Sequence, residues 1–186
     1  SFFQVSSIIT TTGYATTDFD LWPGFSKAVL MCLMLIGACA GSTGGGIKVS
    51  RIIVFVKSAF REIAAYIHPR SVNRIKVEGR VVENESIRAI NVYLTTYVLI
   101  FVASIVFVSI EGQDLVTTFT AVAATINNIG PGLHVVGPTG NFSSFTDLSK
   151  WVLIFDMLAG RLELFPMLIL FHPTIWKQIF QRKARK

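Results

Sequence analysis

Two short stretches combine small, hydroxyl and amide residues in an order that suits the binding of a dehydrated cation. The first is Thr11-Thr12-Gly13-Tyr14, and the second is Asn128-Ile129-Gly130-Pro131-Gly132. An extended backbone whose carbonyl oxygens point to one axis replaces the water around a cation, and glycine permits the backbone angles and the close approach that this requires. We therefore take both stretches as candidate filter loops, with cation ligands at Thr11, Thr12, Asn128 and Ile129.

Each candidate loop follows a short apolar segment. Residues 3–9 precede the first loop and residues 114–127 precede the second, and neither segment reaches the roughly 20 residues that cross a bilayer core. The C-terminal end of a short helix carries a partial negative charge, which favours a cation in the loop that follows. The leading glycines of the two loops lie 117 residues apart, and the order of apolar segments and breaks around them repeats.

Longer apolar segments surround these loops. Residues 88–110 include 21 consecutive residues without a charge, which is typical of a membrane-spanning helix. Residues 25–67 would form one helix of about 65 Å, twice a bilayer core, so we expect a break at the glycine-rich residues 37–46. A last helix is expected over residues 149–178.

Charged residues are few and unevenly placed. The 186 residues are 52% hydrophobic and 15% charged with a net charge of +6, a composition that excludes intrinsic disorder. Nine of the 17 basic residues lie between Lys48 and Arg88, and five more lie in residues 177–186. The positive-inside rule therefore places residues 68–87 and the basic tail 181–186 in the cytoplasm. The alternation of these basic regions with long apolar runs argues against binding of nucleic acid.

The glycine-rich residues 37–46 admit three interpretations. Gly41 and Gly46 have the spacing of a phosphate-binding loop, but the lysine follows one position too late. Gly37 and Gly41 would also suit a close contact between two membrane helices. We favour a break in a membrane helix, because bare backbone at that depth is tolerated only inside protein or beside water.

Arg161 is the most informative single charge. An arginine within a membrane helix is costly unless it faces a cavity or a partner. Asp156 and Glu163 are near in sequence, but neither spacing is ideal for an ion pair on one helix. Arg161 is therefore either half of a structural ion pair or a positive charge that faces a pore, and we interpret Asp156 as its partner.

Four strings carry a resemblance that covers the whole chain. In order they are SSIITTTGY, AGSTGGGIK, NNIGPGL and GRLELFP, beginning at Ser6, Ala40, Asn127 and Gly160. They resemble the C-terminal part of the Trk/Ktr/HKT superfamily of potassium transport proteins. The resemblance implies an all-α polytopic membrane protein with potassium-channel-like helix–pore-loop–helix repeats. Ala15 and Pro131 depart from the strict Thr-Val-Gly-Tyr-Gly filter, which leaves the preference for K⁺ over Na⁺ open.

The resemblance divides the chain into parts of two repeats. Residues 1–67 would hold the end of a third repeat, with a pore helix, a filter loop and a second membrane helix broken by the glycine loop. Residues 88–180 would form a fourth repeat, with a first helix at 88–110, a pore helix at 114–127, a filter at 128–132 and a second helix at 149–178. Since the chain begins at Ser1 without an initiator Met, we expect it to be part of a longer protein.

The resemblance also implies potassium uptake across the bacterial inner membrane. K⁺ would be the transported ion, with no tightly bound cofactor and no enzymatic activity. The expected partners are the lipid bilayer, a second copy in a homodimer and a cytosolic nucleotide-binding regulatory subunit of the TrkA kind. The glycine loop would gate the pore, with gate residues Gly41, Gly44, Gly45, Gly46 and Arg161.

Two other classes of protein stay open. A secondary transporter coupled to Na⁺ or H⁺ also uses broken helices near the membrane midplane, and currents without a coupling ion would oppose it. A membrane-embedded enzyme would need clustered catalytic groups, for which the sequence offers only Asp156, Arg161 and Glu163.

Overall fold

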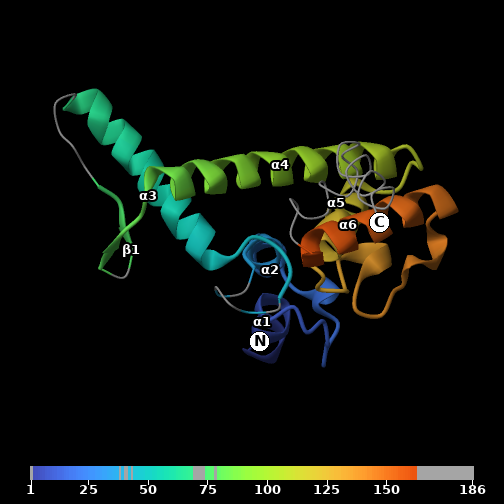
Figure 1. Cartoon of the computed structure of the whole chain (residues 1–186). Helices are drawn as coiled ribbons and strands as arrows, with labels where there is room; N and C mark the ends of the chain where they lie inside the picture. The colour runs from blue at the N-terminus through green and yellow to red at the C-terminus, as the bar shows by residue number, and fades with distance from the viewer. Residues whose placement is uncertain are drawn as a thin grey trace, which may run out of the picture.

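One long helix organises the other helices of the chain. The computed structural model describes residues 2–37, 39, 42, 44–68, 74–77 and 79–162. Helix α4 (Asn84–Ser109) lies across the molecule, and α3 (Val49–Ile67) crosses it near its N-terminal end (Figure 1). Helices α5 (Leu115–Ile126) and α6 (Asp147–Leu162) pack against each other and against the C-terminal part of α4.

Helix α4 is, among the described residues, the one helix long and apolar enough to cross a membrane. Its 26 residues span about 39 Å, which exceeds a bilayer core of about 30 Å. Tyr97 and Phe101 are buried against α5 and α6, whereas Leu99 and Val106 on other faces are exposed. An exposed apolar surface of this kind suits lipid or further helices.

Helices α1 (Phe2–Ile9) and α2 (Gly24–Leu35) form a second pair, joined through the 3₁₀ turn η1 (Phe19–Leu21). Their contact continues into the segment that follows α5, so the early and late parts of the chain share one core. The buried apolar residues of this core are Ile8, Phe19, Leu30, Met34, Ile129 and Leu133. This core places the loop after α1 beside the loop after α5.

The glycine-rich segment separates α2 from α3. Ile36 and Ile47, at its two ends, form an isolated parallel bridge, and the Gly37 N–H donates to the Ile47 carbonyl oxygen at 2.8 Å. A Cβ atom on Gly37 would lie 2.7 Å from the Gly45 carbonyl oxygen, so the two ends approach more closely than another residue would allow. The chain thus leaves α2 and returns to the same place before α3 begins.

A small hairpin lies within residues 68–87, for which the sequence predicts only a polar loop. Strand β1 (Lys76–Val77) pairs antiparallel with β2 (Arg80–Val81) around Gly79, whose φ is +78°. Helix α4 begins at Asn84, before the predicted start at residue 88, because Glu85 in its first turn favours a helix N-terminus. Val54, Ile75 and Ile87 are buried together and hold the hairpin between α3 and α4.

The remaining connections are short. The 3₁₀ turns η2 (His134–Val136) and η3 (Phe142–Ser144) lie in the loop between α5 and α6. The helix predicted over residues 149–178 is described from Asp147 to Leu162. Its remaining part and the basic tail 181–186 lie outside the described residues.

Candidate functional site

The first candidate filter loop leaves α1 in a tight turn. The Thr12 N–H donates to the Ser7 carbonyl oxygen at 2.9 Å. Thr11 and Gly13 both have left-handed backbone angles, with φ of 56° and 80°. The Ser7 hydroxyl donates to the Tyr14 carbonyl oxygen at 2.6 Å, which ties the end of the loop back to α1.

The second loop leaves α5 in the same conformation. The Ile129 N–H donates to the Ala124 carbonyl oxygen at 2.8 Å, and Asn128 and Gly130 have φ of 55° and 110°. In a regular strand successive residues face opposite sides, and left-handed residues at alternate positions turn successive carbonyl groups toward one side. This is the backbone arrangement that a carbonyl-lined cation site needs.

Three backbone hydrogen bonds of the first loop have a counterpart in the second loop. The residues that form corresponding hydrogen bonds lie 117 positions apart, which is also the spacing of Gly13 and Gly130. The corresponding N–H to O=C pairs are Thr10 to Ser6 and Asn127 to Ala123, Thr11 to Ile8 and Asn128 to Thr125, and Thr12 to Ser7 and Ile129 to Ala124. The left-handed residues correspond as well. The backbone therefore has an internal similarity that the side chains show only weakly.

The loops meet directly at Gly13. A Cβ atom there would lie 2.1 Å from the Ile129 carbonyl oxygen, so the contact requires glycine. Beside it lies a pocket of about 470 Å³, whose other wall is formed by apolar residues of α6 together with Lys150. The loop residues that line it are Thr11, Thr12, Asn128, Ile129 and Gly130, which include all four predicted cation ligands.

Four predicted filter residues do not line this pocket. Gly13 makes the contact beside it, Tyr14 is exposed, and Pro131 Cδ lies 3.4 Å from the position that a Cβ atom would take on Gly13. Gly132 turns toward α5 and η2, where its N–H donates to the Val136 carbonyl oxygen at 2.6 Å. Gly132 therefore fixes the connection that follows the second loop.

The end of the glycine-rich segment lies against the end of α5. A Cβ atom on Gly45 would lie 2.5 Å from the Asn127 carbonyl oxygen, and one on Gly46 would lie 2.0 Å from Asn127 Oδ1. Gly46 also has a left-handed φ of +78°. The segment thus reaches the residue that immediately precedes the second loop.

Asn127 is held in place by α4. It is fully buried, its Nδ2 donates to the Ala123 carbonyl oxygen at 2.8 Å, and its Oδ1 accepts from the Tyr97 hydroxyl at 3.0 Å. Asn127 therefore links α4, the end of α5 and the glycine-rich segment. The sequence offered one signal for Asn127, its place at the end of a predicted pore helix, and none for Tyr97.

Arg161 shares a small cavity with the glycine-rich segment. The cavity of about 70 Å³ is lined by Gly44, Gly46 and Arg161, and also by Arg51 and Tyr93. The Arg51 guanidinium lies 4.0 Å from the centre of the Tyr93 ring. Three predicted gate residues therefore border one cavity and Gly45 contacts Asn127 beside it, whereas Gly41 lies outside the described residues.

Asp156 has a different partner from the one that the sequence suggested. Its Oδ1 accepts from the Ser104 hydroxyl of α4 at 2.8 Å, and no ion pair joins it to Arg161 in the described part of the chain. The physical reason is that five residues along a helix turn the side chain by about 140°, which separates the two side chains. Asp156 is fully buried and ties α6 to α4, and Glu163 lies outside the described residues.

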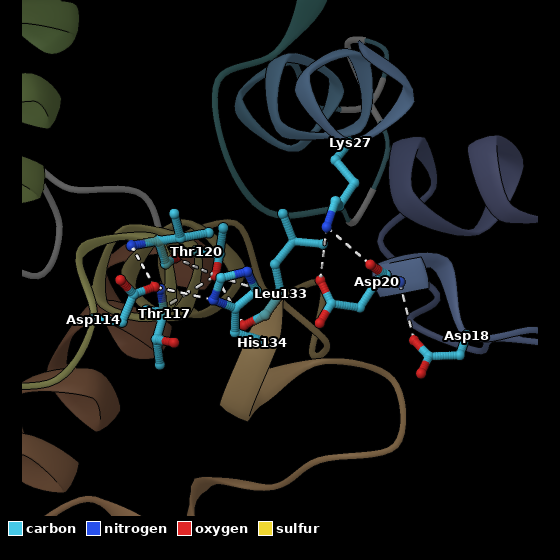
Figure 2. Close-up of polar contacts among 9 residues, drawn as sticks. Asp18, Asp20, Lys27, Asp114, Thr117, Thr120, Leu133 and His134 are labelled. Carbon is cyan, nitrogen blue, oxygen red and sulfur yellow. Dashed lines mark hydrogen bonds and ion pairs between the residues drawn. The ribbon is translucent and has the colours of Figure 1, made fainter. Parts of the chain in front are cut away.

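Polar contacts between α5 and the residues that follow the second loop hold this loop against α5 (Figure 2). The Asp114 carboxylate accepts from the Thr117 N–H at 3.4 Å and lies 3.0 Å from His134 Nδ1. The Leu133 N–H donates to the Thr120 hydroxyl oxygen at 3.0 Å. Among the residues that the structure describes, no group of three or more His, Cys, Asp or Glu side chains could hold a metal ion.

Two further contacts fix the ends of α2 and α4. Lys27 Nζ donates to the Asp20 carbonyl oxygen at 2.8 Å and lies 3.5 Å from the carboxylate of the same residue (Figure 2). The Glu111 carboxylate, beyond the end of α4, accepts from the Thr146 N–H at 3.0 Å and from the Thr146 hydroxyl. Partial burial raises the pKa of Glu111, but hydrogen bonds outweigh this and leave its pKa below the ordinary value.

The chain combines a helix long enough to span a membrane, shorter apolar helices that end in corresponding loops, and a broken helix. These features define a class of protein, the helical membrane transporters. Within this class, the chain belongs to the TrkH family of cation transport proteins, whose family model matches residues 1–178. The matched residues include both loops, the glycine-rich segment and Arg161.

The relatives give the same result. The chain is 43% identical over 178 residues to the Trk system potassium uptake protein TrkH of Escherichia coli (strain K12), covering 96% of this chain and 36% of the relative. It is 35% identical over 177 residues to TrkG of the same strain, covering 95% and 36%. Its structure is similar to the crystal structure of the potassium transporter TrkH from Vibrio parahaemolyticus, with a TM-score of 0.83 and 45% identity over 94% of this chain and 37% of that one. The chain thus spans about a third of the length of the curated relatives that it matches.

Proposed function

We propose that this chain is part of a potassium uptake protein and supplies two of the loops that form its selectivity filter. The observation that carries the proposal is the correspondence of the loops after α1 and α5, in hydrogen bonds and in left-handed residues, together with their contact at Gly13. The relatives named as potassium uptake proteins support K⁺ as the ion. In this proposal residues 1–67 belong to a third pore repeat and residues 88–180 to a fourth.

In the proposed mechanism K⁺ loses its water at the loops and binds backbone oxygens there. The ligands are the carbonyl groups of Thr11, Thr12, Asn128 and Ile129, with further loops supplied by the rest of the protein. Helix α5 directs its negative C-terminal end at the second loop, which offsets part of the cost of dehydration. No tightly bound cofactor and no enzymatic step takes part.

The glycine-rich segment and Arg161 form the proposed gate. Gly44, Gly46 and Arg161 border one cavity, and Gly45 rests on Asn127 directly before the second loop. A positive charge at this level repels a cation that has left the filter, and movement of the glycine-rich segment would open the path. Gly41 belongs to the same proposed gate on the ground of the resemblance.

Orientation and partners follow from the charge distribution and from the family. Residues 68–87 and the C-terminus lie in the cytoplasm of a bacterial cell in this proposal, with α4 running outward through the inner membrane. The protein forms a homodimer and is regulated by a cytosolic nucleotide-binding subunit similar to TrkA. The basic residues of the loop 68–87 and of the tail 181–186 are the proposed contact surface for that subunit.

The filter proposal is tested by K⁺ and Na⁺ flux through the full-length protein in proteoliposomes. Gly13→Ser should abolish discrimination between the two ions, because a side chain cannot fit against the Ile129 carbonyl oxygen. Gly112→Ser is the matched control, since Gly112 also has a left-handed φ but has no atom within 4 Å of its Cβ position. Equal permeation of both ions by the unaltered protein would contradict the filter, and unchanged selectivity of Gly13→Ser would contradict our placement of the first loop.

The gate proposal is tested by Arg161→Ala in the same preparation. Removal of the positive charge should raise K⁺ flux at an unchanged K⁺/Na⁺ ratio, because the filter loops do not include this residue. Arg80→Ala is the control, since this arginine of β2 lines neither this cavity nor the pocket beside the filter loops. Unchanged flux in Arg161→Ala would assign the residue a structural role only.

A further inference from the structure

A larger pocket lies away from the proposed ion pathway, at the start of α4. It has a volume of about 940 Å³ and lies between the second half of α3, the hairpin and the first turns of α4, where these elements meet in Figure 1. Three arginines from three elements line it, namely Arg61, Arg74 and Arg88. The carboxylates that line it are Glu62 and Glu83, so the pocket carries a positive excess.

Two of the three arginines have no partner within the described chain. The Arg61 guanidinium lies 3.0 Å from the Glu62 carboxylate and 3.4 Å from the Asn84 carboxamide oxygen. Arg74 and Arg88 are exposed and make neither an ion pair nor a hydrogen bond with any described residue. A guanidinium group presents several N–H donors in a planar fork that matches the oxygens of a phosphate. The pocket therefore offers one anionic group two guanidinium forks that no described residue engages.

The N-terminal end of α4 borders the pocket. Glu83 stands at the N-cap and makes no side-chain capping hydrogen bond, so the first N–H groups of α4 keep no side-chain acceptor. Glu83 and Asn84 both line the pocket, which places these N–H groups at its edge. Glu83 and Glu85 already supply negative charge at this helix end, so the attraction for an anion rests on the arginines, of which Arg88 follows one turn later on the same helix.

The position of the pocket along α4 indicates where a phosphate would come from. Arg88 is the last charged residue before the 21 uncharged residues 90–110, so it lies at the level where lipid headgroups meet the membrane core. Val92 lines the membrane side of the pocket. Phe60 and Ile63 of α3, which are next in the sequence to the lining residues Arg61 and Glu62, are exposed. The pocket thus combines arginines at headgroup level with apolar side chains where acyl chains would lie.

Asn91 supplies one more feature of a binding site. It lines the pocket, and one end of its carboxamide is buried without a hydrogen-bond partner among the described residues. The buried atom is the Oδ1 acceptor, and the hydroxyl group of a glycerol headgroup would satisfy it by donating a hydrogen bond.

We propose that this pocket binds the phosphate group of an anionic phospholipid, held chiefly by Arg74 and Arg88. The inference rests on the proposed function in one respect, the choice of membrane leaflet, which would be the cytoplasmic one. The binding itself requires no potassium transport, so each proposal can fail without the other.

The test is native mass spectrometry of the full-length protein with phosphatidylglycerol and, separately, with phosphatidylcholine. The protein should retain phosphatidylglycerol preferentially, and Arg74→Gln/Arg88→Gln should weaken its binding about tenfold or more, as the loss of charged hydrogen bonds implies. Lys76→Gln/Arg80→Gln is the matched control, because it removes the same charge from the hairpin while neither residue lines the pocket. Elution volume and melting temperature show that each variant is folded.

Several outcomes would overturn the proposal. Equal weakening by both double variants would mean diffuse attraction to a basic surface, and unchanged binding in Arg74→Gln/Arg88→Gln would mean that no such site exists. Inorganic phosphate or ATP that binds more tightly than the lipid, and loses its affinity only in Arg74→Gln/Arg88→Gln, would assign the pocket to a soluble phosphate instead. Potassium flux measured in parallel reports on the proposed function alone.

Discussion

At the scale of single residues, glycines allow the glycine-rich segment to pack against neighbouring atoms so closely that a side chain would not fit. Gly46 and Gly79 share a φ of +78°, but only Gly46 has an atom, Asn127 Oδ1, within 4 Å of its Cβ position. Alanine substitutions at Gly46 and at Gly79 therefore separate two free-energy costs, that of a side chain on a left-handed backbone and that of disturbing the contact with Asn127.

We expect Gly46→Ala to displace the glycine-rich segment and raise K⁺ flux through the full-length protein. The left-handed backbone alone costs about 1–2 kcal/mol in either variant, and the clash with Asn127 adds about 1–3 kcal/mol in Gly46→Ala. Gly79→Ala should therefore lower the melting temperature less and leave flux unchanged. Similar flux in the two variants would show that the contact with Asn127 does not hold the gate.

Tyr97 is the residue through which α4 reaches the end of α5. Tyr97→Phe removes the donor to Asn127 Oδ1, and a buried acceptor left without its partner costs about 1–3 kcal/mol. We expect a lower melting temperature together with altered K⁺ flux, because Asn127 precedes the second loop and touches Gly46. Tyr66→Phe, on the exposed face of α3, is the control. A stability loss with unchanged flux would leave Tyr97 a purely structural role.

The residues that could be predicted from the sequence differ from those that could not in whether their importance depends on their own backbone or on a distant partner. Gly13, Gly46 and Gly130 are recognisable because glycine marks unusual backbone, and all three have a left-handed φ. Tyr97 and Ser104 lie within an apolar helix, and their hydroxyl groups gain importance only through partners that are distant in the sequence. The wrong pairing of Asp156 with Arg161 arose in the same way, because sequence proximity hid a partner on another helix.

At the scale of elements, close packing of α6 on α5 depends on Gly160. A Cβ atom there would lie 1.7 Å from the Ile126 carbonyl oxygen and 3.0 Å from Asn128 Nδ2. Gly160→Ala should push α6 from the second loop and destabilise the protein by about 1–3 kcal/mol. Gly24→Ala, at the start of α2 with no atom within 4 Å, should change stability by less than about 1 kcal/mol. Equal melting temperatures for the two variants would contradict this packing.

The elements themselves were predictable to different degrees. Apolar runs indicated α2, α4 and α5, because burial in a helix or a membrane needs such runs. The hairpin was not predictable, since its strands have two residues each and depend on burial of Ile75 between α3 and α4. The correspondence of the two loops lies in backbone angles, which sequence identity between the loops does not reveal.

At the scale of the whole molecule, the broken α2–α3 pair fits either a gated pore or a transporter coupled to another ion, and the two differ in energetics. In a pore the membrane potential alone drives the cation, at about 2.3 kcal/mol per charge for 100 mV, which corresponds to about 50-fold accumulation.

We therefore expect K⁺ uptake by proteoliposomes with the full-length protein to follow a potential imposed with a proton ionophore, at constant Na⁺ on both sides. Collapse of a Na⁺ gradient should leave the rate unchanged at that potential, because no carboxylate of a described residue lines the pocket beside the proposed filter loops. Asp156→Asn is the informative variant, since its buried carboxylate lies away from the loop pocket and contacts Ser104. Uptake that requires a Na⁺ or H⁺ gradient, and loses that requirement in Asp156→Asn, would establish coupled transport and displace the pore.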